Sequence, residues 1–101
     1  MPFDQPFPRS FVDSSVRQFA PAASGLYGIS NASGWLFIGE SDNICESLLA
    51  HLRDSGASLF QQRPTGFVFE TCDPGARAAR QSRLIFEYNP SCNGRQSRRR
   101  P

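Results

Sequence analysis

The side chains whose types best suit metal binding or nucleophilic chemistry are three cysteines and one histidine: Cys45, Cys72, Cys92 and His51. The cysteines are odd in number and widely spaced, and no Cys-x-x-Cys pair is present. A structural zinc site draws about four ligands from tight local pairs. The pattern therefore predicts no zinc site, and it favours buried, reduced thiols in a cytoplasmic protein.

Arginine is the residue type whose spacing suggests contacts to nucleic-acid phosphates. Two groups have such spacing: Arg77, Arg80 and Arg83 at every third position, and Arg98, Arg99 and Arg100 in a run. The first group also fits a solvated helix face on which Arg83 pairs with Glu87. The second also fits a solvated tail that aids solubility. The sequence leaves both alternatives open for each group.

The composition indicates one small folded domain with an uneven charge. The chain has 101 residues, of which 39% are hydrophobic, and its net charge is +2 with every basic residue an arginine. Residues 94–101 carry four arginines and no acid, whereas residues 1–93 carry seven arginines against nine acids. The folded part is therefore expected to be mildly acidic, and the net charge does not indicate a basic DNA-binding surface.

The chain divides into three predicted parts. Residues 1–23 form a proline-rich N-terminal arm, in which residues 11–19 are expected to make a short strand or a helical turn over the core. Residues 24–93 form the domain, and residues 94–101 form a basic, disordered tail. The charged N-terminus is unlike a signal peptide, and no stretch approaches the ~20 apolar residues of a membrane span. We expect a cytoplasmic protein without a membrane partner.

A β-hairpin is predicted at the start of the domain. Residues 25–30 and 35–39 have strand patterns, and residues 31–34 (NASG) have the types found in tight turns. Trp35 on the second strand has two alternatives, a stacking platform for a base or a side chain that covers the core or edge of the sheet.

Two helices and a third strand are predicted to follow the hairpin. The first helix covers residues 44–53, the strand covers 67–72, and the second helix begins at Asp73–Pro74 and ends before Pro90. The first helix has three candidate capping residues, Ser41, Asp42 and Asn43. The sequence therefore predicts an α+β fold in the order β-β-α-β-α, with a small three-stranded mixed or antiparallel sheet flanked by helices.

Two tripeptides on the predicted hairpin carry a family resemblance. They are Gly25-Leu26-Tyr27 and Phe37-Ile38-Gly39, and Asn43 then precedes the apolar Ile44. The second predicted helix adds Leu84-Ile85, followed by Pro90-Ser91-Cys92-Asn93. In order and spacing, residues 24–93 resemble the GIY-YIG nuclease superfamily, in particular the N-terminal domain of excision-repair nucleases.

The resemblance implies a site for metal-dependent hydrolysis of phosphodiesters. Two positions keep the residues that the family uses, Tyr27 and His51. Three positions depart from the family: Phe37 replaces a tyrosine, Ser47 replaces an arginine and Gln81 replaces the metal-binding glutamate. A hard cation such as Mg²⁺ prefers anionic oxygen ligands, and the developing phosphate charge needs a fixed cation. We therefore expect no resident metal and inefficient hydrolysis.

Three hypotheses about function follow. The first is a degenerate GIY-YIG domain that binds a protein partner or, weakly, nucleic acid. The second is an active endonuclease that uses Mg²⁺ or Mn²⁺ with relocated groups, for which Glu40, Glu46 and the helix arginines are candidates. The third is an assembly module that docks on another chain through an apolar strand edge or through its Phe-rich arm, with Phe3, Phe7 and Phe11.

Overall fold

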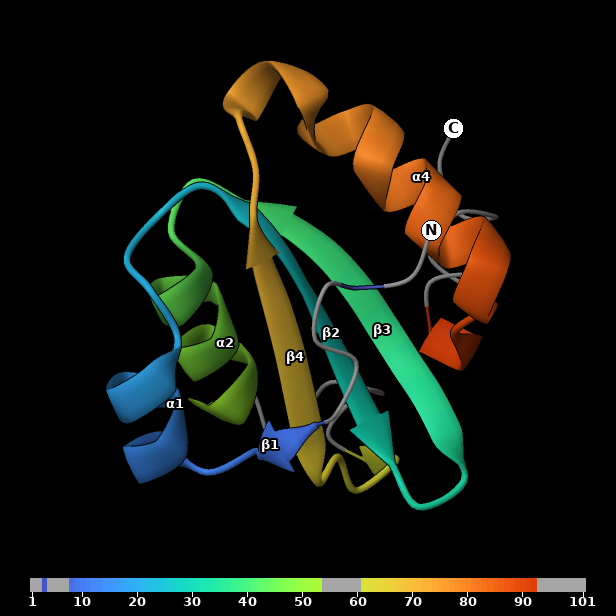
Figure 1. Cartoon of the computed structure of the whole chain (residues 1–101). Coiled ribbons are helices and arrows are strands. Elements are labelled where there is room, and N and C mark those ends of the chain that lie inside the picture. Colours follow the sequence, from blue (N-terminus) through green and yellow to red (C-terminus); the bar gives the residue numbers. More distant parts are fainter. Residues whose placement is uncertain (1–2, 4–7, 54–60, 93–101) are drawn as a thin grey trace.

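The protein folds around a four-stranded sheet. The structure, a computed structural model, describes residues 3, 8–53 and 61–92 (Figure 1). Every strand pair is antiparallel, and the spatial order is β1-β4-β2-β3. The strands are β1 (Arg9–Ser10), β2 (Gly25–Asn31), β3 (Gly34–Ser41) and β4 (Gly66–Thr71).

In the part of the chain that the structure describes, α-helices cover both faces of the sheet (Figure 1). Helices α1 (Asp13–Phe19) and α2 (Ile44–Arg53) lie on one face, and α4 (Arg77–Tyr88) lies on the other. A single 3-10 turn at Pro74–Ala76 precedes α4. The predicted second helix therefore starts as a 3-10 turn, and Asp73 flanks it without a side-chain capping bond.

The predicted α+β class is confirmed, with one strand more than expected. The additional strand is β1, which pairs with β4 in the register Arg9↔Phe67. It comes from the segment that the sequence assigned to an arm, because proline-rich composition hides a two-residue strand. The expected helical turn in residues 11–19 is α1, whose Val16 is fully buried.

Two asparagines set the boundaries of the hairpin and of α2. The side-chain oxygen of Asn31 accepts hydrogen bonds from the backbone N–H groups of Ser33 (2.8 Å) and Gly34 (3.1 Å), which closes the turn between β2 and β3. The side-chain oxygen of Asn43 accepts a bond from the N–H of Glu46 (3.0 Å) and thereby caps α2. Among the three predicted caps, Asn43 is thus the one in the capping position.

The core is double because the sheet is covered on both faces. One cluster joins α1, α2 and the sheet, and the other joins Leu84 of α4 to the opposite face. Phe3 and Phe11 are 2% and 4% exposed within these clusters. They are therefore part of this chain's own core, and the expectation that they dock on another chain is wrong, since their burial here leaves no surface to offer. Phe7 lies outside the described residues.

The three cysteines are free thiols, as expected. Cys92 is buried, but Cys45 and Cys72 are only half-buried, because each lies at the border of its cluster. Within the part of the chain that the structure describes, no helix has both the length and the apolar character needed to cross a bilayer.

The backbones of β2 and β4 approach too closely at Gly25 for any side chain. A Cβ atom on Gly25 would lie 2.2 Å from the carbonyl oxygen of Glu70 and 2.8 Å from the Cα of Thr71. Both obstacles are backbone atoms of the neighbouring strand, which cannot rotate away. This glycine of the first tripeptide is therefore required by strand packing.

We expect Gly25→Ala to lower the free energy of unfolding by about 1–3 kcal/mol, since the sheet must open to admit the methyl group. Gly75→Ala is the matched control, because no atom lies within 4 Å of its added Cβ. We expect that control to stay within about 0.5 kcal/mol of the wild type. Urea unfolding measures both. Equal effects at the two positions would contradict the packing argument.

Candidate functional site

Tyr27 and His51 form the centre of the candidate site. Tyr27 lies on the central strand β2 and His51 in the last turn of α2, and their Oη and Nε2 atoms share a hydrogen bond of 2.9 Å. The Tyr27 side chain is only 5% exposed. Burial raises the pKa of Tyr27 to about 12, so its phenol is neutral at physiological pH.

Gly39 makes the space that the Tyr27 ring occupies. The two residues are directly opposite each other on β2 and β3. A Cβ on Gly39 would lie 2.5 Å from the Tyr27 hydroxyl and 2.9 Å from the Phe37 ring. The glycine of the second tripeptide therefore positions the tyrosine of the first.

Phe37 completes an aromatic cluster on this face. Its ring centroid lies 6.0 Å from that of Tyr27 and 5.1 Å from that of His51. Both rings are tilted against it, the usual arrangement for aromatic pairs. Phe37 fixes its neighbours by packing but contributes no hydroxyl to the site.

Ser47 is part of a capping network and brings no positive charge. Its hydroxyl shares a 2.5 Å hydrogen bond with the hydroxyl of Ser41. The Ser41 oxygen also accepts a bond from the N–H of Asn43 (2.9 Å), at the entry to α2. At the position where the resemblance implies an arginine, the chain therefore has a neutral side chain that is already hydrogen-bonded.

Gln81 acts as a hydrogen-bond donor. It lies on α4, and its Nε2 donates to the backbone carbonyl oxygen of Ile38 on β3 at 3.0 Å. The carbonyl partner identifies the interacting atom as the amide nitrogen, since two oxygen acceptors would repel each other. An ionised glutamate could not make this contact.

The donors at this place do not fit a divalent metal ion. The Gln81 amide is neutral and is held through its nitrogen by Ile38. Among the described residues, no group of three His, Cys, Asp or Glu side chains is arranged to hold an ion. Mg²⁺ prefers carboxylate oxygens in nearly octahedral geometry, and these residues supply none in that arrangement.

Two of the helix arginines are neutralised by acids on or just after the strands of the sheet. Arg77 contacts Glu40 (3.1 Å) and Asp42 (2.6 Å), and its side chain is 15% exposed. Arg80 forms two bonds with Glu70, of 2.6 and 2.9 Å, and its side chain is 18% exposed.

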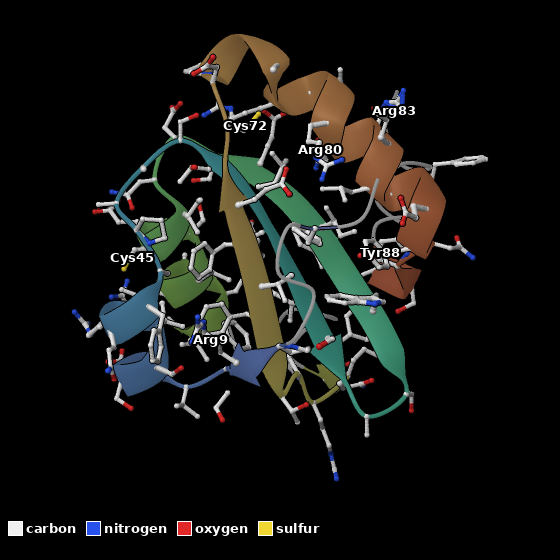
Figure 2. The ribbon with its side chains drawn as sticks, viewed as in Figure 1. Arg9, Cys45, Cys72, Arg80, Arg83 and Tyr88 are labelled. Carbon is white, nitrogen blue, oxygen red and sulfur yellow. The ribbon has the colours of Figure 1, made fainter. Side chains whose placement is uncertain are left out.

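Figure 2 shows Arg80 beneath α4 and Arg83 on its outer side. Arg83 is exposed, so the three arginines do not form a continuous exposed stripe. The run Arg98, Arg99 and Arg100 lies outside the described residues.

The structure thus brings together only part of the predicted set. Tyr27, Phe37 and His51 meet on the α1–α2 side of the sheet, whereas Gln81 approaches from α4 and contacts the backbone of β3. Of the motif residues, Leu26 and Ile38 point into the core on the α4 side. Sequence reasoning missed the Arg80–Glu70 pair. Its available signal was Glu70, an acid two residues after a buried valine on a half-buried strand.

We expect stability at high pH to depend on Tyr27. Its pKa is about 12 in the folded chain against 10.0 normally, so its contribution is complete below pH 10 and is lost as the pH rises toward 12. The full shift corresponds to about 2–3 kcal/mol. Urea unfolding from pH 8 to 11.5 should show a smaller decline for Tyr27→Phe than for the wild type. Tyr88→Phe, the matched control, should keep the decline, and parallel curves for wild type and Tyr27→Phe would contradict the assignment.

Comparison with known proteins addresses the fold. No protein-family model matches the chain, and no curated protein matches it either. Among solved structures, the N-terminal GIY-YIG endonuclease domain of UvrC from Thermotoga maritima, bound to its catalytic magnesium ion, superposes with a TM-score of 0.65. It is 18% identical and the alignment covers 76% of this chain and 93% of that one.

Two variants of that UvrC domain, each bound to its catalytic divalent cation, give the same score. A tyrosine-to-phenylalanine mutant is 17% identical, and an asparagine-to-alanine mutant is 18% identical. Each alignment covers 76% of this chain and 92% of the other. At such identity the similarity concerns the fold. The chain therefore has a GIY-YIG-like fold.

Proposed function

We propose that this chain is a cytoplasmic GIY-YIG-like domain that binds a partner without hydrolysing phosphodiesters. The observation that carries the proposal is the bond from the Gln81 amide to the Ile38 carbonyl. The resemblance implies a metal-binding carboxylate at this position. Here the side chain is an amide that donates its hydrogen bond to the protein backbone.

The chemistry of hydrolysis requires groups that the described site lacks. The developing negative charge on a phosphate needs a fixed cation, and loss of one such electrostatic group typically costs ~10²–10³ in rate. Ser47 is neutral and bonded to Ser41, while Arg77 and Arg80 are held by carboxylates. Tyr27 is too weak an acid to ionise at neutral pH.

The geometry gives little support to a metal site built from carboxylates at other positions. Glu40 is ion-paired with Arg77, so a metal ion there would compete with a guanidinium. Glu46 is exposed on the first turn of α2. The UvrC neighbour is a metal-bound endonuclease, and this similarity is the reason to test cleavage directly.

The charge near the candidate site favours a partner other than duplex DNA. Asp42 and Glu46 are exposed there, and Arg77 is the cation next to Asp42. A surface of this kind does not gain affinity by neutralising phosphates. A protein partner, or single strands held elsewhere on the molecule, agrees better with the described surface.

We expect the wild-type chain to nick supercoiled plasmid no faster with Mg²⁺ or Mn²⁺ than with chelator. The variant Phe37→Tyr, Ser47→Arg, Gln81→Glu restores the three groups that the resemblance implies. We expect it to nick at least ~100-fold faster than the wild type, in a metal-dependent way. Gel densitometry of nicked against supercoiled DNA measures both rates.

The proposal is wrong if the wild-type chain nicks plasmid in a reaction that chelator stops and that His51→Ala removes. The His51 variant separates the chain's own activity from that of a contaminating nuclease. Circular dichroism should first establish that each variant is folded, because Ser47 and Gln81 both take part in hydrogen bonds.

A further inference from the structure

A hollow of about 490 Å³ lies between the β2–β3 turn and the C-terminal end of α4. Its size falls within the ~300–1,000 Å³ typical of small-molecule sites. Two aromatic rings line it, Trp35 and Tyr88, and Figure 2 shows Tyr88 near the end of α4. None of its lining residues is charged. Its two aromatic residues pack on the core cluster of the α4 side, whereas Tyr27 belongs to the cluster on the opposite face of the sheet.

Trp35 is held as a rigid aromatic platform. Its ring centroid lies 4.9 Å from that of Tyr88 and 6.2 Å from that of the buried Phe3. The Tyr88 hydroxyl in turn accepts the backbone N–H of Phe3 (3.3 Å), which ties the three aromatic residues together. Trp35 itself stays half-buried, so part of the indole faces the hollow. Because the Trp35 side chain is already held in place, it loses little conformational entropy when a planar ligand stacks on it.

Polar side chains around the platform are available to a ligand. Gln62, Asn89 and Ser91 line the hollow and are exposed. Within the described residues, their side chains form no hydrogen bonds, and neither does the indole N–H of Trp35. Together they supply both donors and acceptors at the edge of an aromatic plane.

A cation is next in sequence to one residue of this uncharged hollow. Arg63 directly follows Gln62, is exposed, and forms no ion pair within the described part of the chain. Its backbone has a φ of 58°, a left-handed conformation that a residue with a side chain rarely adopts. Asn89, on the other wall, has a φ of 50° and ends α4. These two are the non-glycine residues with positive φ among those described; Asn89 lines the hollow, and Arg63 follows the lining residue Gln62.

We propose that the hollow binds one unstacked base of single-stranded nucleic acid. A base offers an uncharged aromatic face for Trp35 and a hydrogen-bonding edge for amide and hydroxyl groups. The absence of charge in the lining disfavours a free phosphate or an acidic peptide, whereas Arg63 suits the phosphate attached to a base. A paired base inside a duplex cannot enter, because its faces are covered by its neighbours. This inference specifies the ligand of the proposed binding role and rests on that role.

The chain contains a single tryptophan, so its fluorescence reports on the site directly. We expect a ten-nucleotide single strand of mixed sequence to quench Trp35 emission saturably at physiological salt. The same sequence as a duplex should not quench it over that concentration range. An abasic strand of equal length measures what phosphate attraction alone contributes, and we expect it to bind at least about tenfold more weakly.

Substitutions locate the binding by anisotropy of a labelled strand. We expect Trp35→Ala to weaken binding about tenfold or more, and Phe86→Ala to leave it unchanged. Phe86 is the matched control, an aromatic residue of α4 that is 91% exposed and does not line the hollow. Because Trp35 also packs on Phe3, Asn89→Gly provides a second variant. It removes the amide, keeps a residue that tolerates positive φ, and should weaken binding several-fold.

Three results would overturn the inference: no quenching by single strands, equal affinity for the abasic strand, or unchanged affinity in both Trp35→Ala and Asn89→Gly.

A further control uses the full chain with Arg98, Arg99 and Arg100 changed to Gln. We expect it to lower affinity at low salt and to leave the quenching at saturation intact. Plasmid nicking decides the proposed function separately, since a base can bind here whether or not the chain cleaves DNA.

Discussion

The central strand β2 is the constraint on which the rest of the structure depends. It is hydrogen-bonded to β3 on one side and to β4 on the other, and every residue from Gly25 to Ser30 is buried. Its side chains therefore fit only where a neighbour leaves space. Gly25 permits the close approach of β4, and Gly39 leaves room for the Tyr27 ring. Packing therefore requires glycine at both positions, whether or not the site is chemically active.

Under the proposed function, the fold persists with an altered site because its framework does not depend on the chemistry of that site. Tyr27 and His51 are held by packing and by their shared hydrogen bond, which require no metal ion. Ser47 and Gln81 each form a hydrogen bond within this chain, and Arg77 and Arg80 form ion pairs within it. The side chains at the positions that the resemblance assigns to phosphate chemistry therefore have partners within the protein.

Much of the fold could be predicted from the sequence because its signals are local. The alternation of strand residues, the NASG turn and the cap at Asn43 each act within a few positions. Strand β1 and the burial of Phe3 depend on partners about 60 and 85 positions away, which periodicity does not reveal. For the site, the resemblance pointed to Tyr27 and Gln81 as candidates. The hydrogen bond that Gln81 donates depends on where α4 lies against β3, which the sequence does not reveal. The hollow beside Trp35 also arises from segments distant in sequence, and only the stacking alternative for Trp35 pointed toward it.

The most direct test of the account is an NMR titration of the full ¹⁵N-labelled chain with Mg²⁺. Because the Gln81 amide is held as a donor, we expect that its side-chain signal and the backbone signals of Ile38 and Tyr27 do not move as Mg²⁺ is raised to millimolar concentrations. We also expect slow exchange of the Gln81 amide proton that donates to Ile38. Saturable shifts centred on Gln81 and Tyr27 would contradict this expectation, because they would place a metal ion where the account places a hydrogen-bond donor.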